Sequence, residues 1–100
     1  MGQRIEIDST RVIDDSLLIS TNRSFTGTDG EGFGSSEDAA AGTTFPAKLA
    51  VDLFEADDAI RRVYVSQNVV VITRRDGWTT DATASASAVV GEFFLFYPAA

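Results

Sequence analysis

The sequence predicts one α+β domain with two layers, in which two helices cover one face of an antiparallel four-stranded sheet (β-β-α-β-β-α). Short apolar runs typical of strands come in two pairs, and a helical pattern follows each pair. The chain has 100 residues, a length at which one hydrophobic core forms without staples, so residues 1–100 form a single domain. Only one helix links the strand pairs and no phosphate-binding turn is present, which argues against a doubly wound parallel sheet.

The first strand pair is predicted near the N-terminus. Residues Gln3–Asp8 alternate polar side chains with Ile5 and Ile7, the pattern of a strand with one buried face. Ser9–Asp15 then reads as a polar connection, and Ser16–Thr21 is a second short apolar run. A link of this length allows the two strands to pair antiparallel.

A long segment, Asn22–Thr44, separates the second strand from the first helix. It holds most of the chain's glycines, several acidic residues and two phenylalanines, a composition typical of a mobile loop. We predict a flexible, acidic, Gly-rich loop over residues 22–44, with an ordered functional loop as the alternative. The stretch Gly30–Gly34 lacks the Lys of a phosphate-binding loop, and the spacing of the acids does not match a calcium loop.

A helix and then a β-hairpin are predicted in the middle of the chain. Thr44 supplies a capping hydroxyl, and over Pro46–Ala56 the apolar residues recur at spacings of three and four, which indicates an amphipathic helix. Two aspartates end this helix. The β-branched runs Ile60–Ser66 and Asn68–Arg74 then predict two paired strands with a turn centred on Gln67.

The C-terminal part of the chain predicts a last helix. Capping residues are available at Thr79, Thr80 and Asp81, the helical pattern continues to about Phe94–Tyr97, and Pro98 ends it. The second half of this helix carries more apolar side chains than one packing contact requires.

Composition excludes many functions. The chain has no Cys and no His, so it cannot build disulfide scaffolds, thiolate cluster ligation or His-based catalysis, and we expect neither an enzyme nor a cofactor. Its net charge of −7 argues against nucleic acid or anionic lipid as a partner. No secretory signal and no membrane-spanning run is present, so we expect a soluble, cytoplasmic protein.

Adjacent charged residues have structural explanations that we prefer to functional ones. Asp14-Asp15 and Asp57-Asp58 could be catalytic carboxylates, but adjacent acids in a turn and at a helix end are more often caps or solvated charges. Arg61-Arg62 and Arg74-Arg75 lie on the two strands of one predicted hairpin. Pairing with local acids such as Asp76 is favoured there over an anion site.

Aromatic residues near the C-terminus are the candidate site for a protein partner. Trp78 is expected to connect the last helix to the sheet. Four aromatic residues within five positions cannot all face one layer, so some are expected to form a partner surface. The candidate interaction residues are Trp78, Phe93, Phe94, Phe96 and Tyr97.

Residues 45–78, followed by Gly91-Glu92-Phe93-Phe94, resemble the N-terminal domain of the Nfu/NifU-type iron-sulfur cluster scaffold proteins. The shared features are a Pro-Ala helix start, a Leu-Phe pair in the helix, two Val-rich strands, a Trp and a last helix with Phe-Phe. The matching positions are Pro46, Ala47, Leu49, Leu53, Phe54, Ile60, Val63, Tyr64, Asn68, Val70, Val71, Thr73, Trp78, Phe93 and Phe94.

The resemblance implies a stand-alone, non-catalytic protein-binding module that is accessory to iron-sulfur cluster assembly or delivery. In that family a Cys-x-x-Cys motif in a separate C-terminal domain carries the cluster, and this chain, without Cys, is no thiolate scaffold. The partner is then an assembly or client protein that docks on the face containing Trp78 and residues 93–97. Two alternatives stay open: a self-associating structural domain, and a small metal-dependent enzyme that uses carboxylates.

Overall fold

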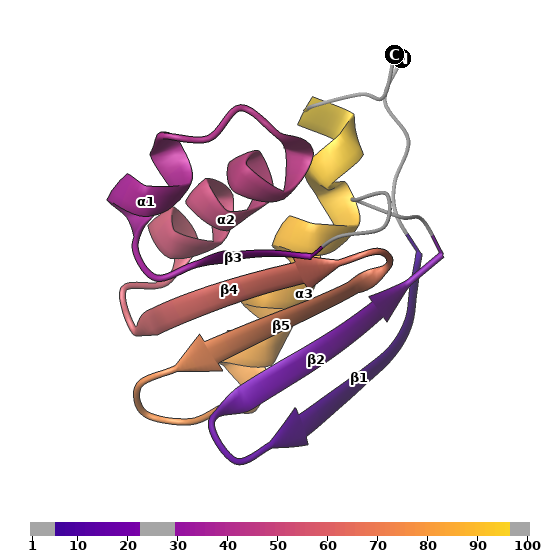
Figure 1. Cartoon of the computed structure of the whole chain (residues 1–100). Helices are drawn as coiled ribbons and strands as arrows, with labels where there is room; N and C mark the ends of the chain where they lie inside the picture. The colour runs from indigo at the N-terminus through magenta and orange to yellow at the C-terminus, as the bar shows by residue number, and fades with distance from the viewer. Residues whose placement is uncertain (1–5, 23–29, 97–100) are drawn as a thin grey trace.

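The computed structural model describes residues 6–22 and 30–96, with the side chains of residues 94–96 outside the description. It is an α+β fold in which all helices lie on one side of an antiparallel sheet (Figure 1). The sheet has five strands in the order β1-β2-β5-β4-β3. The elements are β1 (Ile7–Ile13), β2 (Ser16–Thr21), β3 (Glu31–Phe33), α1 (Ser36–Ala40), α2 (Phe45–Ala56), β4 (Ile60–Ser66), β5 (Val69–Arg74) and α3 (Thr80–Phe96).

The core lies between the sheet and the helices. Alternate residues of β2 and β5 are buried against it, because side chains of a strand point to opposite faces in turn. In β4 the buried residues are Ile60, Val63 and Val65, since a bulge after Ile60 shifts the alternation by one residue. On the helix side, the core is formed mainly by buried side chains of α2 and α3. The largest fully buried hydrophobic side chains are Leu17, Ile19, Leu49, Leu53, Val63, Val65, Val70, Ile72, Val90 and Phe93.

The first strand differs from the expectation. It spans Ile7–Ile13, so the segment Ser9–Asp15, predicted as a connection, is mostly strand, and the turn to β2 is reduced to Asp14 and Asp15. Asp14 takes a left-handed conformation with φ of 55°, as a tight hairpin turn requires. The strand carries no alternating pattern because it is an edge strand whose residues after Ile7 are all exposed. The expected start, residues 3–5, lies outside the described residues.

The segment predicted as a flexible loop also contains structure. Residues 23–29 lie outside the described residues, but the remainder forms β3, which pairs with β4, and the short helix α1. The start of α1 is capped in both directions: Asp38 N–H donates to Ser35 Oγ (3.0 Å) and Gly34 N–H donates to Asp38 Oδ2 (3.1 Å). Phe33 and Ala39 are buried. The sheet therefore has a fifth strand, and a third helix joins the predicted two.

The remaining elements confirm the predictions. Thr44 caps α2, since its Oγ1 accepts a hydrogen bond from the Ala47 N–H at 3.3 Å. The β4–β5 hairpin turns at Gln67, which has φ of 53°. The hydroxyl of Thr79 accepts from the Ala82 N–H at 3.1 Å and begins α3. These elements are set by local capping and periodicity, which the sequence displays directly.

Candidate functional site

One face of the sheet carries no helix in the described part of the chain, and we call it the open face (Figure 1). Strand register assigns its residues, because residues paired across antiparallel strands point to the same side. They alternate with the buried residues of the other face. The open face comprises Ser9, Arg11, Ile13, Ser16, Leu18, Ser20, Gly32, Arg62, Tyr64, Ser66, Val69, Val71 and Thr73.

Three apolar side chains form a continuous row across the middle of the open face. Leu18 of β2 pairs with Val71 of β5, and Val71 pairs with Tyr64 of β4. Leu18 and Val71 are half-buried, whereas Tyr64 is 43% exposed. An antiparallel sheet that only faces water usually carries polar residues on that side. This apolar row is therefore unusual for a solvated face.

The charges on the open face are all positive. Arg11 pairs with Leu18 at one end of the apolar row, and Arg62 lies two residues from Tyr64 at the other. No Asp or Glu is among the described residues that the strand register assigns to the open face, although the whole chain has 15 acidic and 8 basic residues; Asp8 lies in the bulge between Ile7 and Ser9, where the register assigns no face. The other polar residues are small; Ser16 Oγ and Thr73 Oγ1, for example, lie 3.3 Å apart. The register-paired positions of this face thus carry positive charge in a chain that is negative overall.

Two recesses adjoin Arg62 at the β3–β4 margin of the face. The smaller has a volume of about 300 Å³ and is lined by Gly32, Phe33, Gly34, Arg62 and Tyr64. The larger, of about 730 Å³, is lined by Gly34, Ser35, Ser36, Phe54, Asp58, Ile60, Arg61, Arg62 and Thr73. Both are open to solvent and share Arg62, whose side chain is exposed and has no ion pair within residues 6–22 and 30–96.

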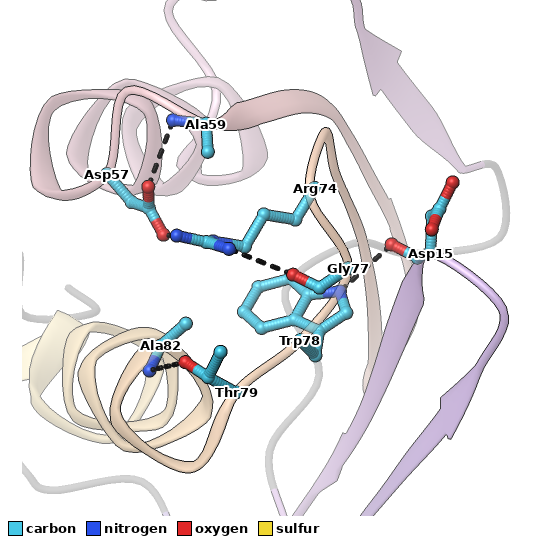
Figure 2. Close-up of polar contacts among 8 residues, drawn as sticks. All are labelled: Asp15, Asp57, Ala59, Arg74, Gly77, Trp78, Thr79 and Ala82. Atoms are coloured by element: carbon cyan, nitrogen blue, oxygen red, sulfur yellow. Dashed lines mark hydrogen bonds and ion pairs between the residues drawn. The ribbon is translucent and has the colours of Figure 1, made fainter.

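Arg74, on the same hairpin, is in contrast fixed by structural contacts (Figure 2). Its Nε donates to Asp57 Oδ2 at 2.7 Å and its Nη1 donates to the Gly77 carbonyl at 2.9 Å. Asp57 Oδ1 accepts from the Ala59 N–H at 2.9 Å, and the paired side chains are only 18% and 17% exposed. The expected partner of the hairpin arginines was a local acid such as Asp76, but the acid that pairs with Arg74 is Asp57. This ion pair connects the end of α2 to the end of β5.

The same contacts lower the pKa of Asp57. Burial by itself raises the pKa of this carboxyl, but hydrogen bonds from Arg74 and from the Ala59 N–H, with the charges of Arg74 and Arg75, outweigh it. The pKa of Asp57 is therefore below its ordinary value of 3.8. In the folded protein, the carboxylate stays ionised to lower pH than in the unfolded chain.

This pKa shift predicts a loss of stability in acid. Because the folded-state pKa of Asp57 is lowered, its contribution is fully present above pH 3.8 and is lost as the pH falls from there through the folded-state pKa. Urea denaturation at a series of pH values should show the free energy of unfolding falling over this range. The Asp57→Asn variant should show a shallower fall, and an unchanged slope in that variant would contradict the assignment.

The predicted aromatic site residues are only partly described. Phe93 is 1% exposed and packs edge-on against Phe45, with ring centroids 6.0 Å apart, so it belongs to the core and not to an exposed surface. Trp78 is half-buried against the core, and its Nε1 donates to the Asp15 carbonyl at 2.9 Å (Figure 2). The backbone of Phe94 and Phe96 continues α3, but their side chains and Tyr97 lie outside the described residues. Their role in partner binding stays a prediction.

The open face was not predicted, although the sequence carries a signal for it. The strand β5 has Val69 and Val71 on one side and Val70 and Ile72 on the other, so both sides are apolar. A strand that is apolar on both sides is expected to be covered on both sides. In the described residues only one side of β5 is covered.

Metal-ligating side chains are not gathered in the described part of the chain. Residues 6–22 and 30–96 contain no group of three or more His, Cys, Asp or Glu side chains that could hold a metal ion. Within the same residues, no helix is long and apolar enough to cross a membrane.

Comparisons with known proteins show the fold alone. No family model matches the sequence, and no curated protein matches it significantly. The structure is similar to the crystal structure of protein SAV1430 from Staphylococcus aureus, with a TM-score of 0.63 and 10% sequence identity. The match covers 84% of this chain and 96% of that one. At this identity the likeness carries no function, and the Nfu/NifU-type resemblance stays a prediction from sequence motifs.

Proposed function

We propose that the protein is a non-catalytic protein-binding module that docks its partner on the open face of the sheet. The observation that carries this proposal is the apolar row, which crosses three adjacent strands without a covering helix. Apolar side chains that adjoin across strands on an uncovered sheet face support an interaction surface there. The small side chains around the row, such as Ser16, Ser20 and Thr73, let a partner approach the sheet closely.

The charges favour a different protein over a second copy of this chain. Two open faces packed on each other place Arg11 and Arg62 of both copies in one interface, and the register-paired residues of the open face supply no carboxylate to neutralise them. Like charges buried at an interface cost several kcal/mol, on the order of what a small interface contributes. Self-association, the alternative structural role, is therefore not favoured on this face.

The class of partner comes from the sequence motifs. The Nfu/NifU-type resemblance over residues 45–78 suggests a protein of iron-sulfur cluster assembly or delivery. Because the chain has no Cys, its contribution is docking, with any cluster ligands supplied by the partner.

A variant at the centre of the apolar row tests the proposal. Val71→Lys places a charge where partner contact is expected, while Ala56→Lys adds the same charge at an exposed position on α2, on the helix side. Chemical crosslinking in native lysate, with the crosslinked positions mapped by mass spectrometry, should find a partner on the open face. Val71→Lys should weaken its capture at least about tenfold, about 1.4 kcal/mol, and Ala56→Lys should not.

The other outcomes are informative. Equal capture by both variants, or crosslinks confined to the helix side, contradicts docking on the open face. A homodimer seen by light scattering and dissociated by Val71→Lys would replace the proposal with self-association. A partner unrelated to iron-sulfur proteins leaves the docking surface standing and removes the proposed partner class.

A further inference from the structure

We infer that the open face binds an acidic amphipathic helix, whose apolar stripe covers the apolar row and whose carboxylates pair with Arg62 on one side and Arg11 on the other. This inference rests on the proposed function, because it specifies the chemistry of the partner that docks on the same face.

The charge of the open face is opposite to that of the whole chain. The net charge is −7, yet the charged residues that the described strand register assigns to the open face are two arginines and no carboxylate. At physiological salt the Debye length is about 8 Å, so distant acids on the helix side are largely screened from a partner seated on the sheet. The local field on this face therefore favours a partner with carboxylates.

Arg62 can bind a carboxylate of a partner, because it has no ion pair in the described residues and adjoins a recess. It stands between the two recesses of the β3–β4 margin, and the smaller recess has no acidic lining residue. Asp58 is the acid that lines the larger one, which makes the smaller recess the better seat for an incoming carboxylate. Arg74 is held by Asp57 at 2.7 Å, whereas Arg62 has no ion pair in the described residues.

The two arginines are spaced to flank one helix. Arg11 lies on β1 and Arg62 on β4, three strand spacings apart in the order β1-β2-β5-β4. At about 4.8 Å per strand this separation is about 14 Å across the sheet, with an offset of about 7 Å along the strands. A helix with its side chains is about 10–12 Å wide. A helix laid along the strands between β2 and β5, over Leu18 and Val71, therefore has one arginine about 7 Å from its axis on each side.

A pair of synthetic peptides tests this inference. Both are about 15 residues long, enough to span about 22 Å as a helix, and share the same Leu stripe; one carries Glu beside the stripe and the other carries Lys. They are titrated into the ¹⁵N-labelled full chain at physiological salt. The Glu peptide should bind with a Kd below about 1 mM and shift the amides of Leu18, Tyr64 and Val71, and the Lys peptide should bind at least about tenfold more weakly.

Matched charge reversals identify the arginines. Arg62→Glu and Arg11→Glu should each weaken the Glu peptide by at least about threefold, and the double variant by about tenfold or more. Lys48→Glu makes the same charge change on α2, on the helix side, and should leave the affinity within about twofold. Circular dichroism melting curves establish that each variant is folded.

Several results would overturn the inference. They are equal or tighter binding of the Lys peptide, loss of affinity in Lys48→Glu as large as in Arg62→Glu, and a single-stranded oligonucleotide that shifts the same amides at lower concentration. Absence of Glu-peptide binding to the open face below about 1 mM also overturns it. The proposed function fails separately, when Val71→Lys leaves capture of the natural partner unchanged.

Discussion

Replacing Phe93 with Ala is expected to destabilise the fold by about 3–5 kcal/mol. The ring is 1% exposed and meets Phe45 of α2 edge-on at an interplanar angle of 83°, so it connects α3 to α2 within the core. Its removal leaves a cavity that the surrounding side chains fill only in part. Because a domain of this size is stable by roughly 5–15 kcal/mol, the loss should appear as a large shift of the urea midpoint.

Two control variants separate the cavity from other effects. Phe93→Leu keeps most of the buried volume and should cost less than Phe93→Ala, about 1–2 kcal/mol. Val12→Ala removes methyl groups from a side chain that is 50% exposed and should change stability by no more than about 0.5 kcal/mol. A small loss of stability in Phe93→Ala, together with weaker partner capture, would contradict the core assignment and indicate that Phe93 contacts the partner.

Replacing Asp57 with Ala is expected to cost about 2–3 kcal/mol at neutral pH. The substitution leaves Arg74, which is 18% exposed, without its carboxylate partner, and it also removes the acceptor of the Ala59 N–H. Both losses fall at the junction of α2 with β4 and β5. Urea denaturation followed by circular dichroism measures the effect.

A double-mutant cycle isolates the pair itself. Asp57→Ala, Arg74→Ala and the double variant should give a coupling energy of at least about 1 kcal/mol, because the pair is largely shielded from water. Asp58→Ala, at the exposed neighbouring position, should be neutral within about 0.5 kcal/mol. A coupling energy below about 0.5 kcal/mol would show that the contact behaves like an ordinary surface salt bridge.

The contacts of Asp57 also distinguish the roles of the two arginines Arg62 and Arg74 of the β4–β5 hairpin. Arg74 has a structural role, because its guanidinium donates hydrogen bonds to Asp57 and to the Gly77 carbonyl. Arg62 pairs across the strands with Thr73, on the opposite side of the sheet from the core, beside two recesses. Sequence alone treats the two arginines alike, since each stands in a β-branched run beside another Arg. Only the register of β4 and β5 separates the structural cation from the candidate binding cation.

Elements whose cause is local could be predicted from the amino-acid sequence alone. The helix α2, the β4–β5 hairpin and the helix α3 follow from capping hydroxyls, apolar spacing and a turn at Gln67, all of which act within a few residues. The class of the fold followed from their order. The predicted connection over Ser9–Asp15 and the predicted loop over residues 22–44 were wrong in part, because β1 is an exposed edge and β3 forms by pairing with β4 far along the chain.

Which surfaces are buried and which are left uncovered depends on packing between segments that are distant in the chain. Alternation along β2, β4 and β5 reveals two faces, but which face receives the helices depends on contacts between α2, α3 and the sheet. The same contacts place Phe93 inside and leave the apolar row and its two arginines outside. Packing between distant segments sets both outcomes, and a single sequence does not display such contacts, so the candidate site emerged only from the folded chain.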